Sequence, residues 1–113
     1  MGEPFIPSRL RFSLEIFPPK SSEGIEKLEE TLATYAVYGP SCVTVTFGAG
    51  GTTDNIDRAR ALVRYIDQTH HIPVAAHVIC AGRTKRDVDD IVDGFWEDGV
   101  RRIVALRGDV LQR

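Results

Sequence analysis

Residues 73–80, PVAAHVIC, form a continuous apolar run that His77 alone interrupts. Such a run lacks the alternation of a half-exposed strand and is typical of a strand buried on both faces of a parallel sheet. After it, Thr84 with Asp87 three positions on predicts a capped helix that extends to Gly99. A buried strand followed by an amphipathic helix makes one β-α unit.

The same unit recurs on both sides of this run. Upstream, residues 42–47, CVTVTF, are rich in β-branched side chains and predict a strand, after which Thr53 or Asp54 opens a helix. Downstream, residues 102–106 predict a further strand, with residues 107–109 as its exit loop.

The first unit begins near the N-terminus. Residues 11–17, RFSLEIF, alternate apolar and polar side chains and predict a strand that residues 18 and 19, both proline, close. Ser21 or Ser22 then caps a helix that the Gly39-Pro40 pair stops.

Comparable strand positions are separated by 31, 31 and 29 residues; they are Phe12, Val43, Val74 and Ile103. This β-α repeat predicts an α/β fold with a parallel sheet of four strands and three helices. Right-handed crossovers leave two architectures, a small doubly wound open sheet or part of a (β/α)8 barrel. Because a barrel typically needs about 250 residues, length alone favours the open sheet.

Composition limits the classes of partner. The 113 residues contain 14 Lys plus Arg and 16 Asp plus Glu, and the two signs are interspersed. The sequence therefore lacks the basic stripe that would predict a nucleic-acid partner. No apolar run approaches the roughly 18 residues of a membrane span, and the N-terminus lacks the apolar core of a signal peptide, so we expect a cytoplasmic protein. Cys42 and Cys80 lie in apolar strand-like contexts and are interpreted as reduced core thiols, with no metal site expected.

Four polar residues recur near the ends of the predicted strands. They are Glu15, Thr46, His77 and Asp109, separated by 31, 31 and 32 residues. Each alone has an ordinary structural explanation, such as a solvated side chain or a turn former. Four in register predict a ligand site, because both candidate folds bind ligands at the C-terminal edge of the sheet.

The loop at residues 48–52, GAGGT, follows the second strand and precedes a helix. Its backbone N–H groups could approach a phosphate or an aromatic ring. It lacks the GxGxxG spacing and the GxxxxGK[ST] lysine, so a plain turn is equally consistent with the pattern.

Four segments, FSLEIFPPK, VTVTFGAGGT, AAHVIC and IVALRGD, in this order resemble the N-terminal part of the methylenetetrahydrofolate reductase family. The resemblance runs from about Phe12 to Asp109. It implies a (β/α)8 TIM barrel that binds FAD, of which residues 1–113 would be a single partial domain, about half of the barrel. It also implies reduction of 5,10-methylenetetrahydrofolate to 5-methyltetrahydrofolate for methionine synthesis, with NADH or NADPH as electron donor.

The resemblance implies roles for particular residues. Glu15 matches the general acid that helps to open the five-membered ring of the folate. We expect partial burial among Leu14, Ile16 and Phe17 to favour its neutral form. Leu14 and Ile16 stand where aromatic residues are common in the family.

The remaining matches concern the flavin. Asp109 resembles an aspartate beside flavin and folate, and Thr46 a position near nicotinamide and flavin. Phe47 replaces a tyrosine usual in many members. The other matched flavin-contacting positions are Ala49, His77, Leu106, Arg107 and Gly108.

Two alternatives stay open besides a reductase fragment that is inactive on its own. One is a non-catalytic flavin-binding or interaction module that forms a homo-oligomer through its open sheet edges. The other is a small receiver-like signalling domain, which is disfavoured because the carboxylates at strand ends are only Glu15 and Asp109 and the last lysine is Lys85.

Overall fold

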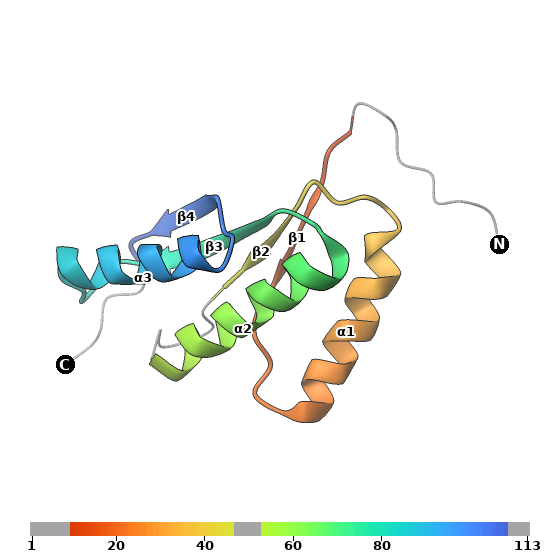
Figure 1. The fold of residues 1–113 in the computed structure, drawn as a ribbon, viewed down its shortest axis with the longest axis horizontal. Helices are drawn as coiled ribbons and strands as arrows, with labels where there is room; N and C mark the ends of the chain where they lie inside the picture. Colours follow the sequence, from red (N-terminus) through yellow and green to blue (C-terminus); the bar gives the residue numbers. More distant parts are fainter. Residues whose placement is uncertain (1–9, 47–52, 109–113) are drawn as a thin grey trace.

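A computed structural model of the chain describes residues 10–46 and 53–108. The predicted site residues Phe47, Ala49 and Asp109, and the predicted loop at residues 48–52, lie outside these residues. The elements follow one another in strict β-α alternation (Figure 1): β1 Ser13–Ile16, α1 Ser22–Ala36, β2 Cys42–Val45, α2 Thr53–His70, β3 Val74–Ile79, α3 Lys85–Glu97 and β4 Arg102–Leu106.

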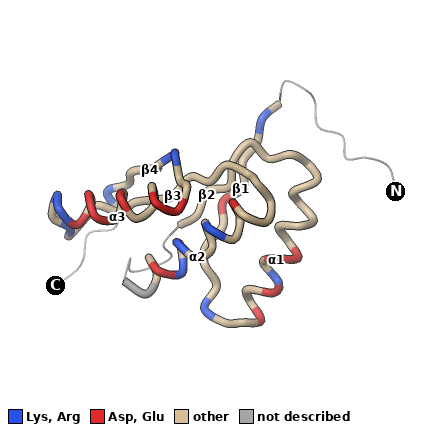
Figure 2. The backbone as a smooth tube through the Cα atoms, in the orientation of Figure 1, with Lys and Arg blue, Asp and Glu red and all other residues tan. Residues whose placement is uncertain are grey.

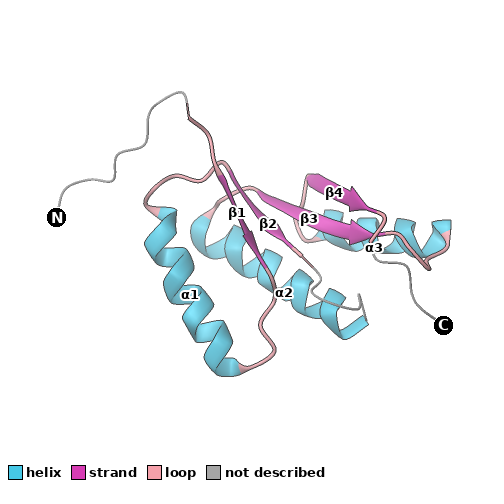
Figure 3. Cartoon of the chain, turned by 180° about the vertical axis from the view of Figure 1, so that it is seen from behind, coloured by secondary structure: helices cyan, strands magenta, loops and turns pink. Residues whose placement is uncertain are grey.

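The strands form one parallel sheet in the order β1-β2-β3-β4. Figure 1 looks onto the three helices, and Figure 3, from behind, looks onto the strands, so the helices cover one face of the sheet. A doubly wound sheet reverses its strand order and carries helices on both faces. The chain therefore has the arrangement of about half of a (β/α)8 barrel. The doubly wound sheet, which the chain length alone favoured, is wrong.

The core lies between the sheet and the helices. Its strand residues come at alternate positions of the central strands, and its helical residues are apolar side chains at helical spacing. The fully buried ones include Val43, Val45, Ala76, Val78, Leu32, Ala59, Val63, Ile66 and Phe95. Full burial of each larger apolar side chain contributes roughly 1.5–3 kcal/mol, which fixes the helices to this face.

Helix caps form where the sequence predicts them. The Ser21 Oγ accepts a hydrogen bond of 3.0 Å from the Gly24 N–H at the start of α1. At α3, the Asp87 N–H donates to Thr84 Oγ1 at 3.1 Å and the Thr84 N–H donates to Asp87 Oδ2 at 2.9 Å, which completes a capping box. Hydrogen bonds from the Thr84 backbone N–H and from the Thr84 side chain to the Asp87 carboxylate lower the pKa of Asp87.

The strand register differs from the sequence spacing. Leu14 on β1, not Phe12, lies level with Val43, and Ile103 lies level with Ala76, two residues beyond Val74. The predicted correspondences of Phe12 and Ile103 are therefore each wrong by two residues. The interval between repeats includes the loops as well as the strands. Loops of unequal length therefore shift the register of the strands, here by two residues.

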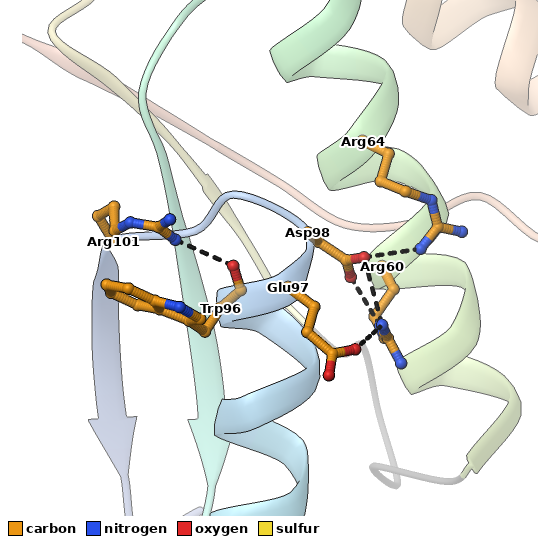
Figure 4. Close-up of polar contacts among 6 residues, drawn as sticks. All are labelled: Arg60, Arg64, Trp96, Glu97, Asp98 and Arg101. Atoms are coloured by element: carbon orange, nitrogen blue, oxygen red, sulfur yellow. Dashed lines mark hydrogen bonds and ion pairs between the residues drawn. The ribbon is translucent and has the colours of Figure 1, made fainter.

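A cluster of charged side chains joins α2 to α3 (Figure 4). Arg60 Nε donates to Asp98 Oδ2 at 2.6 Å, and Arg64 donates to Asp98 Oδ1 at 3.0 Å. Burial of Asp98, whose side chain is 5% exposed, opposes ionisation, but the hydrogen bonds from Arg60 and Arg64 and their charges outweigh it, and its pKa is lowered. Asp98 thus ties the end of α3, and the turn into β4, to α2.

Charges of both signs are mixed along the three helices (Figure 2). Beyond α3, the guanidinium of Arg101 lies 3.5 Å from the ring centre of Trp96 and donates to the Trp96 carbonyl at 2.9 Å. These contacts lie on the helix side of the sheet.

Candidate functional site

The sheet face opposite the helices, here called the open face, carries the candidate site. Strand residues point alternately to the two faces, and partners in a parallel register point the same way. The open face therefore comprises Ser13, Glu15, Cys42, Thr44, Ala75, His77, Ile79, Arg102, Val104 and Leu106.

Two predicted site residues meet on this face. The Nε2 atom of His77 lies 3.5 Å from Oε1 of Glu15, the distance of an ion pair rather than of a short hydrogen bond. The His77 side chain is 12% exposed and the Glu15 side chain 67%. The contact crosses β2, which lies between their strands.

The prediction that the four polar residues lie at the same level of the sheet is partly wrong. Glu15 pairs with Thr44, which pairs with Ala75, so Glu15 lies two residues below His77. Thr46 follows the last ladder pair and, in continuation of the same register, is level with His77. The Thr46 N–H donates to the Ile16 carbonyl at 3.0 Å, which keeps it against β1.

The expected apolar enclosure of Glu15 is also wrong. Leu14 and Ile16 flank Glu15 in sequence but point to the helix face, where they pack against the core. Phe17 is 69% exposed. Strand alternation is the reason, because the neighbours of a strand residue lie on the opposite face.

The segment that follows β4 lies beside the end of β3. The Cys80 N–H donates to the Leu106 carbonyl at 2.9 Å, and the Ala81 N–H donates to the Arg107 carbonyl at 2.8 Å. Gly108 has φ +79°, and a Cβ there would overlap the side chain of Ile79. The structure thus brings residues 106–108 to the same edge of the sheet as His77 and Thr46.

A hollow of about 340 Å³ lies between β1 and α1, at the edge of the described sheet. Its lining includes Glu15, Phe17, Pro19, Lys27 and Leu28. No pattern in the sequence associates α1 with Glu15. The helical spacing that puts Lys27 and Leu28 on the turn nearest β1 is visible in the sequence, but the packing angle of the helix is not.

The described residues give less support to a metal site, a disulfide or a membrane-spanning helix. Residues 10–46 and 53–108 contain no cluster of three or more His, Cys, Asp or Glu that could hold a metal ion. Cys42 is buried and Cys80 half-buried, and both are free. None of the helices described is long and apolar enough to cross a membrane.

Comparison with known proteins gives one consistent family. A family model for methylenetetrahydrofolate reductase matches residues 6–113. The 5,10-methylenetetrahydrofolate reductase of Pectobacterium carotovorum is 33% identical over 104 residues, which cover 92% of this chain and 34% of that protein. The enzyme of the same name in Escherichia coli K12 is 30% identical, over 93% of this chain and 35% of that protein.

A plant relative extends the comparison. Methylenetetrahydrofolate reductase (NADH) 1 of Zea mays is 32% identical over 101 residues, which are 89% of this chain and 17% of that protein. The chain thus spans about a third of the length of the bacterial relatives. With a family model over residues 6–113 and the strand order of a barrel, the chain belongs to the methylenetetrahydrofolate reductase family, whose N-terminal part it matches.

Proposed function

We propose that residues 1–113 form a partial domain, the first half of a cytoplasmic FAD-dependent barrel. The reaction is the reduction of 5,10-methylenetetrahydrofolate to 5-methyltetrahydrofolate, used for methionine synthesis, with NADH or NADPH as electron donor. The observation that carries the proposal is the meeting of Glu15 and His77 on the open face of a chain from this family. Barrels of parallel strands bind their ligands at this edge, through polar groups at the strand ends.

The described residues at the edge fit a flavin. Arg107 is exposed beside this edge, and its guanidinium suits an anionic group such as a pyrophosphate. The flavin contact of Gly108 is proposed from the resemblance alone, because the Ile79 side chain fills the space of its missing Cβ. His77 and Thr46 offer polar atoms on the adjacent strands. When bound, FAD supplies hydride transfer between nicotinamide and folate.

Glu15 is proposed as the general acid. A carboxyl must carry a proton when it donates, and donation to a folate nitrogen opens the five-membered ring to an electrophilic iminium. Because the described neighbours leave the Glu15 side chain 67% exposed, exclusion of water from it falls to the ligands and to barrel strands beyond β4.

Further roles rest on the resemblance of the segments. Asp109 is proposed to lie beside flavin and folate, Ala49 and Leu106 to contact flavin, and Thr46 and Phe47 to lie near nicotinamide and flavin. Phe47 in place of tyrosine keeps a ring for stacking without a hydroxyl group.

The chain alone is proposed not to turn over substrate, because four strands do not close a barrel. The test joins the chain to the remaining two thirds of the Pectobacterium relative. We expect flavin bleaching under NADH or NADPH and reoxidation by 5,10-methylenetetrahydrofolate, as in the parent relative. A chimera that binds FAD and is bleached, yet is not reoxidised by the folate, would contradict the proposed reaction.

A second candidate function is a binding module that self-associates. It is favoured by exposed apolar side chains near the two edge strands: Phe17 is 69% exposed at β1, and Leu106 is 40% exposed at β4. In that case the 113-residue chain binds FAD or a second copy, and the chimera shows no folate reduction.

A further inference from the structure

The contact between Glu15 and His77 joins two residues that do not lie level in the sheet. With about 4.8 Å between strands and about 3.3 Å per residue, their backbones are offset by about 10 Å across the sheet and about 7 Å along it. The separation of 3.5 Å between Nε2 and Oε1 therefore requires both side chains to extend toward each other over β2. Glu15 reaches toward the C-terminal edge to make this contact.

The surroundings hold the two side chains unequally. His77 belongs to β3, which pairs with β2 on one side and β4 on the other, and its ring is 12% exposed. Glu15 belongs to β1, an edge strand of the described sheet, and its side chain is 67% exposed. An exposed glutamate samples many rotamers unless a partner selects one, so the imidazole is the fixed member of the pair.

We propose that His77 is a positioning residue for Glu15, whose carboxyl it draws across β2 to the C-terminal edge of the open face. The inference rests on the proposed function and gives His77 a role separate from contact with flavin. Without the imidazole, the carboxyl of Glu15 falls back toward the level of Thr44, about 7 Å from the level of His77. A proton donor displaced by even part of that distance no longer reaches a substrate bound at the edge.

Few charged groups compete for His77 on this face. Glu15 is the single carboxylate among the described strand residues that point to it. Arg102, level with Ala75 on β4, and Arg107 after β4 carry positive charge and offer no side-chain acceptor for a hydrogen bond from the imidazole. Glu15 is therefore the acidic partner that the described face offers His77.

Two matched substitutions separate positioning from flavin contact. His77→Gln keeps an amide nitrogen near the place of Nε2, whereas His77→Asn places its amide near Nδ1 and falls short of Glu15. Each is made alone and with Glu15→Gln in the chimera with the Pectobacterium relative. Reoxidation by 5,10-methylenetetrahydrofolate and FAD affinity are measured for every variant.

We expect His77→Asn to slow folate reduction roughly 10- to 100-fold, mainly in kcat, and His77→Gln to retain most of the rate. In the Glu15→Gln background the Asn substitution should have little further effect, because its target is already absent. Equal losses in Gln and Asn variants, or an undiminished loss in the Glu15→Gln background, would overturn the positioning role. Failure of the proposed function has a different signature, namely full activity of Glu15→Gln itself.

A second measurement does not depend on activity or on the chimera. Side-chain carbon NMR of the 113-residue chain follows the Glu15 carboxyl signal in the wild type and in both His77 variants. We expect the signal to move in His77→Asn and to stay nearer its wild-type position in His77→Gln. An identical Glu15 signal in all three proteins would show that the contact does not form and would overturn the proposal.

Discussion

Gly108 packs so closely against Ile79 that a Cβ at residue 108 would overlap the Ile79 side chain. Gly108 also has φ +79°, which lies in the left-handed region. Two independent constraints thus require glycine where the segment after β4 runs beside the end of β3. One of them, the conformation, is shared with Gly39, whose φ is +68° but whose Cβ position meets nothing within 4 Å.

We therefore predict that Gly108→Ala is more destabilising than Gly39→Ala. The alanine at residue 39 costs about 1–2 kcal/mol of unfolding free energy from left-handed strain, and the alanine at residue 108 adds the displacement of Ile79. Urea denaturation of both variants measures the difference. Equal losses of unfolding free energy in the two variants would mean that the Ile79 side chain moves aside at no cost.

Glu15→Gln tests the acid. The amide preserves size and shape but cannot donate the same proton, so we predict that reoxidation by the folate falls roughly 100-fold or more in the chimera. Flavin bleaching by NADH or NADPH needs no proton on the folate and should be largely unchanged. Glu26→Gln on the exposed side of α1 is the control. If both half-reactions slow equally, Glu15 serves flavin binding instead, and if neither slows, the assignment of the acid to β1 is wrong.

Asp98→Asn tests the cluster between α2 and α3. The pKa of Asp98 is lowered in the folded protein, so its stabilisation is present above the ordinary value of about 3.9 and is lost as the pH falls through the lower folded value. We predict that Asp98→Asn lowers the unfolding free energy at pH 7 by about 1–3 kcal/mol and by less near pH 3. Urea denaturation at several pH values measures this, with Asp93→Asn, at an exposed position of α3, as the control. A loss that does not shrink on acidification would contradict the ionic origin.

FAD affinity of the 113-residue chain should be much weaker than that of the complete chimera. Contacts from His77 and from residues 107–108 are retained, while those from strands beyond β4 are lost. Quenching of FAD fluorescence on titration with each protein measures the two affinities. Stoichiometric binding by the chain at submicromolar concentration would show that its four strands suffice.

Association of the chain should depend on its open edges. We predict that the 113-residue chain dimerises or aggregates with rising concentration, and that Ile103→Glu on edge strand β4 weakens this association. Tyr38→Glu is a matched control, because Tyr38 is 40% exposed and Ile103 39%, and Tyr38 lies between α1 and β2. Light scattering across a concentration series measures the molar mass of both variants and of the wild type. A monomer of 12.5 kDa at every concentration would favour a self-contained sheet.

Local structure was predictable from the sequence because its causes are local. The capping box of Thr84 and Asp87, the Ser21 cap and the strand at residues 102–106 depend on side chains within a few positions of one another, and all three are confirmed. The strands are slightly shorter than the predicted ranges 11–17 and 73–80, since they span Ser13–Ile16 and Val74–Ile79. Hydrogen bonds to neighbouring strands nevertheless continue at Pro73 and Cys80, just outside the second of these bounds.

The family resemblance, which joins four segments in order, indicated the barrel correctly, whereas length alone pointed to a doubly wound sheet. Periodicity could not decide between the two, since both repeat a β-α unit and differ only in the direction in which each crossover moves. That direction is a property of the assembled sheet.

By itself the sequence determined the elements, their caps and the candidate residues Glu15, Thr46 and His77. Only the tertiary structure decided that Glu15 lies two residues below His77, that Leu14 and Ile16 turn away from it, and that its carboxyl nonetheless reaches the imidazole. The physical reason is that register depends on how whole strands align after their loops close, and a contact across an intervening strand depends on two side chains whose directions no local pattern specifies.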